Sequence, residues 1–180
     1  IASIVPNHDK SLIAHVEDQL PFLLNSPKEH FIARHFLESI EPSGWLGKSL
    51  DEIHINTKVP YVDLENVLIK LQGSEPTGLF ARNLSECLRL QILEKGLMCH
   101  GLSVLLDNLS LLGKGDLKGL VRKIGCDERK IKDFLAIIRS VNPKPGSLFL
   151  SENSNMHKPD LLVRKVGKDW IVDLNRSTLP

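Results

Sequence analysis

Residues 76–92 read PTGLFARNLSECLRLQI, a turn that leads into a stretch with apolar residues at every fourth position. This spacing predicts an amphipathic helix. Asn83 and Glu86 stand three residues apart at its start. We therefore expect Asn83 to be the N-cap and Glu86 to accept a hydrogen bond from the cap's own N–H. The alternative, that Asn83 contacts a ligand, stays open.

Similar start signals recur along the chain. Ser26 precedes Pro27 and Glu29, and Ser49 stands three residues before Glu52, so both serines are expected to begin helices. Pro21 should break or kink the helix that contains it. The periodic segments predict helices at 12–24, 26–40, 50–53, 61–72, 84–95, 101–112, 116–124 and 128–141.

Beyond residue 146 the apolar period changes to two. Alternating residues predict strands at roughly 160–166 and 169–174, joined around Gly167 and Lys168 as a β-hairpin. The predicted fold is mainly α: two small helical subdomains with helix-turn-helix-like hairpins, closed by a short C-terminal β-hairpin. We assign residues 1–10 to a linker, 11–75 to the N-terminal subdomain and 76–180 to the C-terminal subdomain.

The two helix-turn-helix-like segments resemble each other. When Leu50 is aligned with Leu117, other apolar positions coincide, and Pro76 falls on Pro143. This pattern indicates one helical hairpin used twice. A chance likeness between two amphipathic helix pairs remains the alternative.

Net charge is +1, but it is unevenly spread over the 180 residues. Residues 1–80 contain six Lys or Arg against eleven Asp or Glu, and residues 81–180 contain seventeen against eleven. Such an imbalance can steer a charged partner, or it can be an ordinary solvated surface.

The cysteines indicate a reducing compartment. Cys87, Cys99 and Cys126 are odd in number and widely spaced, which does not indicate a disulfide framework. We therefore expect a cytoplasmic protein. No apolar run approaches the ~18 residues of a membrane span, so no membrane association is expected. Because the first residue is Ile1 rather than Met, we expect an excised segment of a longer protein.

The sequence contains none of the motifs that carry common catalytic chemistry. It lacks HExxH, GxSxG, GxxxxGK[ST] and GxGxxG. We therefore expect no enzymatic activity, no cofactor and no metal site.

Four stretches resemble the core-binding region of the bacterial sigma-54 family of transcription initiation factors. The resemblance covers nearly the whole chain from Ser11 onward. The stretches are SLIAHVEDQL at 11–20, IARHFLESIEPSGWLGKSLDEI at 32–53, PTGLFARNLSECLRLQI at 76–92, and IRSVNPKPGSLF at 138–149 followed by KPDLLVRKVGKDWIVDLN.

This resemblance implies a noncatalytic, monomeric segment that docks on core RNA polymerase. Family members contact AAA+ activators and read promoter DNA through other regions, which these residues do not contain. The fragment should therefore bind polymerase without selecting promoters. The family signature is carried here by Pro76, Gly78, Ala81, Asn83, Glu86, Pro143, Pro145, Gly146 and Trp170, which we interpret as structural.

The signature loop departs from the family pattern at two positions. Thr77 and Phe80 replace the usual Ala and Gly. If the loop requires a positive φ at the glycine position, Phe80 strains or moves it.

Charged residues at loops and on the predicted hairpin are the candidate polymerase contacts: Arg82, Lys144, Arg164 and Lys165. The interruptions between residues 73 and 82 also predict a hinge between the subdomains. The rival interpretation is a nucleic-acid-binding helix-turn-helix module. Acidic Asp63 and Glu65 in the first candidate reading helix disfavour it.

Overall fold

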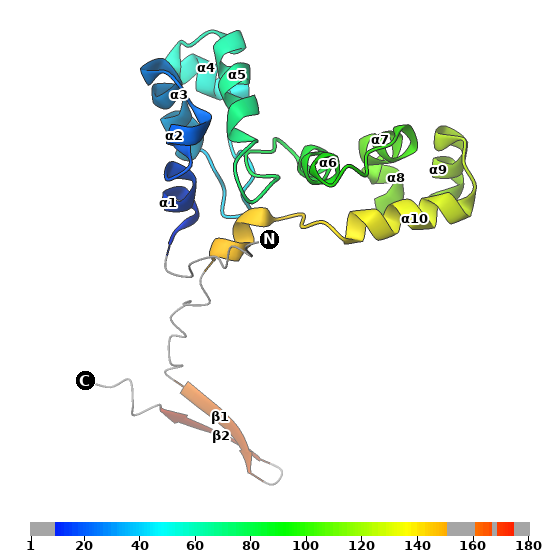
Figure 1. The fold of residues 1–180 in the computed structure, drawn as a ribbon. Helices are drawn as coiled ribbons and strands as arrows, with labels where there is room; N and C mark the ends of the chain where they lie inside the picture. The colour runs from blue at the N-terminus through cyan, green and yellow to red at the C-terminus, as the bar shows by residue number, and fades with distance from the viewer. Residues whose placement is uncertain (1–9, 151–160, 167–168, 175–180) are drawn as a thin grey trace, which may run out of the picture. The chain divides into compact units, whose positions relative to one another are not determined.

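The computed structural model describes residues 10–150, 161–166 and 169–174. It divides into two units, Ile1–Phe149 and Leu150–Pro180, and each is described by itself. The first unit is built from helices (Figure 1), which confirms the prediction of a mainly α fold. Its α-helices are α1 (Leu12–Glu17), α2 (Leu20–Leu23), α3 (Pro27–Leu37), α4 (Leu50–Thr57), α5 (Tyr61–Leu71), α6 (Leu84–Glu94), α7 (His100–Asp107), α8 (Leu109–Gly113), α9 (Leu117–Ile124) and α10 (Glu128–Arg139).

Helices α1–α5 enclose the first hydrophobic core. The predicted capping box at Ser26 is confirmed, because its side chain accepts from Glu29 N and Glu29 accepts from the cap backbone. Lys70 on α5 then donates to Glu29 Oε1 at 2.6 Å, which joins α5 to α3. The buried face of α5 is formed by Leu64, Val67, Leu68 and Leu71, at the helical spacing that predicts this helix in the sequence.

The segment predicted as one helix at 12–24 is two helices. α1 ends at Glu17, and Pro21 lies in the first turn of α2. A proline ring clashes with the carbonyl four residues earlier, which is that of Glu17. The expected break is therefore real, but it falls before Pro21 rather than at it.

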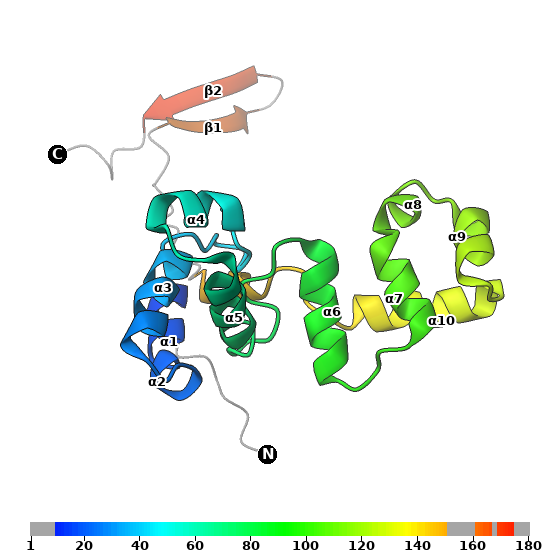
Figure 2. The same ribbon diagram turned by 90° about the horizontal axis from the view of Figure 1, so that it is seen from above.

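Helices α6–α10 follow α5 along the chain (Figure 2). Their buried side chains form two smaller apolar clusters. The prediction of one helix at 101–112 is wrong, because the chain breaks at Asn108 between α7 and α8. Asn108 Nδ2 donates to Val104 O at 2.7 Å. Its side chain therefore competes with the backbone bonds that would continue α7.

The apolar spacing of residues 128–141 predicts that Ile131, Phe134, Leu135 and Ile138 are buried, which is only partly correct. Ile131 is buried, whereas Phe134, Leu135 and Ile138 are half-buried. The three half-buried side chains still pack on the apolar clusters. The small size of these clusters leaves one side of each such residue accessible to solvent.

The α4–α5 and α9–α10 hairpins have matching boundaries. When Leu50 is aligned with Leu117, α4 coincides with α9, and the start of α5 coincides with the start of α10. The cap residues also coincide: Lys58 (φ 56°) and Gly125 (φ 71°) both end their helices in the left-handed conformation. The two hairpins thus share local geometry beyond the apolar pattern seen in the sequence.

The second unit contains strands β1 (Leu161–Val166) and β2 (Asp169–Leu174). They pair antiparallel, with Leu161 opposite Leu174 and Val166 opposite Asp169. Residues 167–168, the predicted turn, and residues 1–9, most of the predicted linker, lie outside the described residues.

Candidate functional site

Three loops that are distant in sequence meet in the first unit. We call them the loop junction: residues 42–46, 76–83 and 142–147. Backbone hydrogen bonds hold them together, from Phe80 N to Gly44 O (2.8 Å), from Leu46 N to Ala81 O (2.9 Å) and from Gly146 N to Ser43 O (2.9 Å). Two of these loops, residues 76–83 and 142–147, contain most of the signature residues, and residues 42–46 lie within one of the four resembling stretches.

Glycines allow this close approach. Gly44 has φ +90°, and a Cβ there would stand 2.6 Å from Leu79 Cδ2 and 2.8 Å from Gly146 N. Gly78 has φ +100°, and a Cβ there would stand 2.7 Å from Gln91 Nε2. Gly44 therefore disfavours other residues both through backbone conformation and through a close backbone neighbour, and Gly78 does so chiefly through its conformation.

Side chains from α6 and from residues 42–46 form hydrogen bonds to the third loop, residues 142–147. The buried amide of Gln91 donates from Nε2 to Asn142 O (2.6 Å) and accepts at Oε1 from Asn142 N (2.8 Å). Trp45 Nε1 donates to Pro143 O at 2.9 Å. Sequence reasoning missed both residues, although a glutamine on the apolar face of an amphipathic helix was a usable signal.

Cys87 lies beside the same carbonyls. Its Sγ is 3.7 Å from Pro143 O and 3.8 Å from Asn142 O. Burial raises the pKa of the Cys87 thiol, so the group stays protonated at neutral pH. A protonated thiol is a weak donor and an inert structural residue rather than a nucleophile.

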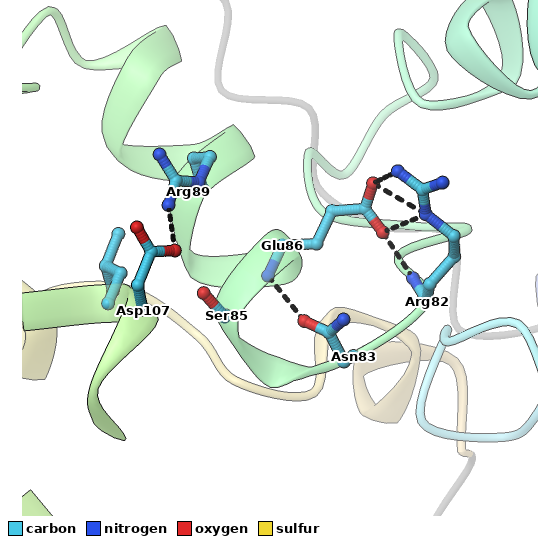
Figure 3. Close-up of a pocket in the computed structure, with 7 residues that line it drawn as sticks. Arg82, Asn83, Ser85, Glu86, Arg89 and Asp107 are labelled. Carbon is cyan, nitrogen blue, oxygen red and sulfur yellow. Dashed lines mark hydrogen bonds and ion pairs between the residues drawn. The ribbon is translucent and has the colours of Figure 1, made fainter. Parts of the chain in front are cut away.

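The N-cap prediction is confirmed, but the role of Glu86 differs. Asn83 Oδ1 accepts from Glu86 N at 2.9 Å, as expected for the cap. Glu86 was expected to accept from the N–H of Asn83. Instead, its Oε2 accepts from Arg82 N (2.6 Å), and its carboxylate pairs with the Arg82 guanidinium at 2.7 Å (Figure 3).

The Arg82–Glu86 pair shifts both titrations. Burial acts to raise the pKa of the Glu86 carboxyl, but hydrogen bonds from the Arg82 side chain and backbone outweigh burial and lower that pKa. The hydrogen bond to Glu86 raises the pKa of Arg82. The Arg82 side chain is 50% exposed, so it remains accessible while it is paired.

An open hollow of about 500 Å³ lies beside this pair. Arg89 closes its other side and donates to Asp107 Oδ1 at 2.7 Å (Figure 3). Arg89 also donates to Ser103 Oγ at 2.7 Å. Each guanidinium in the hollow faces one carboxylate. The paired charges leave no net attraction for a charged ligand.

The other candidate contacts lie in both units. Lys144 is exposed at the loop junction, where its N donates to Asn142 Oδ1 at 2.9 Å. Arg164 and Lys165 are on β1, and their side chains lie outside the described part of the structure. The structure thus brings Arg82 and Lys144 to one junction, whereas Arg164 and Lys165 belong to the second unit.

The signature residues fall mainly in or next to the loop junction. Gly78, Ala81, Pro145 and Gly146 are buried there, Pro76 and Glu86 are half-buried, and Asn83 and Pro143 are exposed. Trp170 pairs with Lys165 in the strand register, but its side chain is outside the described residues.

Exposed apolar residues on α4 and α5 form a second feature, which the sequence analysis did not identify. Ile55 is 70% exposed, Val62 69% and Ile69 67%. Val62 and Ile69 are seven residues apart, so they share one face of α5 with exposed Glu65. We call Ile55, Tyr61, Val62, Glu65 and Ile69 the α4–α5 face.

Among the described residues, no group of three or more His, Cys, Asp or Glu side chains is placed to hold a metal ion. The three cysteines are free. Within the same residues, no helix has the length and apolar character needed to cross a membrane.

Comparison with known proteins gives one consistent match. Residues 3–180 match the family described as "Sigma-54 factor, core binding domain". The chain is 39% identical over 176 residues to the RNA polymerase sigma-54 factor of Cereibacter sphaeroides and 40% identical over 176 residues to that of Rhodobacter capsulatus. It is 37% identical over 171 residues to that of Rhizobium etli.

The alignments cover 98%, 98% and 94% of this chain, but 41%, 41% and 33% of those relatives. The chain therefore spans about two fifths of the length of the first two.

Proposed function

Because the chain belongs to the sigma-54 factor family and matches its core binding domain nearly end to end, we propose that residues 11–180 bind core RNA polymerase without catalysing a reaction. The family match is the observation that carries this proposal. Promoter DNA selection and activator contact are assigned to regions other than this one.

The α4–α5 face supports the proposal as a protein-docking surface. Interfaces bury apolar cores with polar rims, and this face combines Ile55, Val62 and Ile69 with Glu65. The candidate cations Arg82, Lys144, Arg164 and Lys165 add contacts that steer association.

The domain division is part of the proposal. The N-terminal subdomain, residues 11–75, is extended by Leu79 and Phe80, which pack in the first core. We assign residues 76–180 to the C-terminal subdomain, of which the β-hairpin belongs to the separate second unit. The hinge at 73–82 stays a prediction, and relaxation measurements showing rigid common tumbling of the two subdomains would contradict it.

Binding of the 180-residue chain to core RNA polymerase, measured by biolayer interferometry, tests the proposal. We expect saturable binding that a full-length sigma-54 factor displaces. Substituting Val62 and Ile69 with Ser should weaken binding at least tenfold, whereas the same change at exposed Leu93 and Leu97 serves as the matched control. Absence of displaceable binding would contradict the proposal.

The candidate cations need a separate variant. Replacing Arg82, Lys144, Arg164 and Lys165 with Gln should weaken binding and flatten its dependence on salt. An unchanged affinity and salt slope would remove these four residues from the contact surface.

A further inference from the structure

The α9–α10 hairpin is the most basic part of the described chain. Between residues 114 and 133 it has seven basic side chains against four acidic ones. All seven cations are exposed: Lys114, Lys118, Arg122, Lys123, Arg129, Lys130 and Lys132.

Two of the four carboxylates are occupied as helix caps. Asp116 Oδ1 accepts from Gly119 N at 2.8 Å, and Asp127 Oδ1 accepts from Lys130 N at 3.2 Å. The remaining carboxylates are those of Glu128 and Asp133. Within residues 10–150, no ion pair includes any of the seven cations. Lys123 Nζ donates to Asn108 Oδ1 at 2.6 Å, and the other six make no side-chain hydrogen bond there.

The helices hold these cations on outward faces. Leu120 and Ile131 are buried in the cluster between α7, α9 and α10. Lys118 and Arg122 are four residues apart on the side of α9 away from Leu120, and Lys132 follows Ile131 on α10. Six of the seven charges are therefore positioned by α9 and α10, and the seventh, Lys114, lies at the C-cap of α8.

The composition of this surface distinguishes among partners. Within α9 and α10 the one large apolar side chain that is exposed is Leu117, at 38%, whereas Ile55, Val62 and Ile69 on the α4–α5 face are 67–70% exposed. Protein interfaces need a desolvated apolar core, whereas nucleic-acid interfaces are polar and positively charged. The surface therefore suits a polyanion better than an acidic protein.

We propose that the α9–α10 hairpin binds the phosphate backbone of double-stranded DNA without reading base sequence. Lys and Arg contacts to phosphates supply affinity and position a protein, but they carry no sequence information. This activity is separate from polymerase docking and uses a different face of the chain.

Two triple variants with the same change in charge test the proposal. K118Q/R122Q/K132Q removes two lysines and one arginine from the hairpin, and R34Q/K48Q/K58Q removes the same residue types elsewhere from exposed positions. Each variant is first checked for an unchanged melting temperature, and a variant that melts lower is replaced by its single substitutions.

Fluorescence anisotropy with a labelled duplex of about 20 base pairs provides the readout, between about 50 and 200 mM salt. We expect the hairpin variant to lose at least tenfold in affinity at the lower salt. Its log–log salt slope should fall in magnitude by about 3, because each lost phosphate contact removes about 0.9. The control variant should keep most of the affinity.

Several outcomes would overturn the inference. They are no binding by the unsubstituted chain at low salt, equal losses in the two variants, a strong preference for one duplex sequence, or equal competition by polyglutamate, which would indicate an acidic protein partner. Polymerase binding by the hairpin variant is measured in parallel, so that failure of DNA binding and failure of docking are separate results.

Discussion

The backbone nitrogen of Gly44 lies 2.5 Å from the point where a Cβ atom on Gly146 would stand. The two loops therefore meet backbone to backbone, and Gly146 N also donates to Ser43 O. This close contact is possible because neither glycine has a side chain.

Gly146→Ala should destabilise the fold. The new methyl group would also stand 2.7 Å from Pro42 O, and backbone atoms cannot move aside as a flexible side chain can. We expect the free energy of unfolding to fall by about 2–3 kcal/mol, as for overpacked sites. Urea unfolding followed by circular dichroism measures it. Gly113→Ala, where no atom lies within 4 Å, is the control and should cost nothing.

Phe80→Gly should lower stability even though it relieves backbone strain. Phe80 has φ 57° and is fully buried, so the positive φ considered from the sequence is real and Phe adopts it. The left-handed conformation costs about 1–2 kcal/mol for a residue with a Cβ. Removing a buried Phe side chain costs about 3–5 kcal/mol, so the cavity outweighs the relief.

Urea unfolding should therefore show a net loss of about 2 kcal/mol for Phe80→Gly, the difference between these two effects. Phe80→Ala keeps the backbone strain and should lose more than Phe80→Gly. A Gly variant as stable as the unsubstituted chain would mean that the loop repacks.

Lys58→Gly should raise stability slightly. Lys58 ends α4 at φ 56° and is exposed, so it contributes strain without burial. Glycine removes the strain but adds entropy to the unfolded chain, which leaves a gain of about 0.5 kcal/mol. The reciprocal substitution Gly125→Lys, at the matching end of α9, should lose stability. Thermal melts should show a higher melting temperature for Lys58→Gly and a lower one for Gly125→Lys.

Glu86→Gln should change the pH dependence of unfolding. The folded-state pKa of Glu86 lies below its ordinary value of 4.5, so the folded protein holds that proton less tightly than the unfolded chain. The resulting stabilisation is fully present above about pH 4.5 and is lost as pH falls through the folded-state pKa.

At pH 7 we expect Glu86→Gln to lower the free energy of unfolding by about 1 kcal/mol, because Arg82 loses its charged acceptor. The difference between the two proteins should shrink as the solution becomes acidic. Urea titrations from pH 7 to pH 3 measure it, with exposed Glu94→Gln as control. A difference that grows at low pH would contradict the assignment.

Helix starts could be predicted because their chemistry is local. Ser26, Asn83 and Asp127 each accept from an N–H three residues ahead, and that spacing is visible in the sequence. The partner of Glu86 was less predictable, since Arg82 N and Asn83 N are neighbouring donors and only the loop conformation decides between them.

The loop junction could not be predicted from the sequence. Its bonds join Gly44 to Phe80 and Ser43 to Gly146 through backbone atoms, which have no residue-specific signature. Glycine in both loops indicates that another segment approaches closely, but the sequence does not identify that segment. The break at Asn108 was hidden for another reason, because the leucine pattern continues through it.

The loop at residues 43–46 accepts a backbone hydrogen bond from Phe80, where the chain leaves the first group of helices. It accepts another from Gly146, where the chain returns. Phe149 then packs against the first core, with its ring 4.7 Å from that of His15. In architectural terms α6–α10 is an insertion into a host formed by α1–α5 and residues 142–149. During synthesis on the ribosome, the packing of the host cannot be completed until the whole insertion and residues 142–149 after it have emerged.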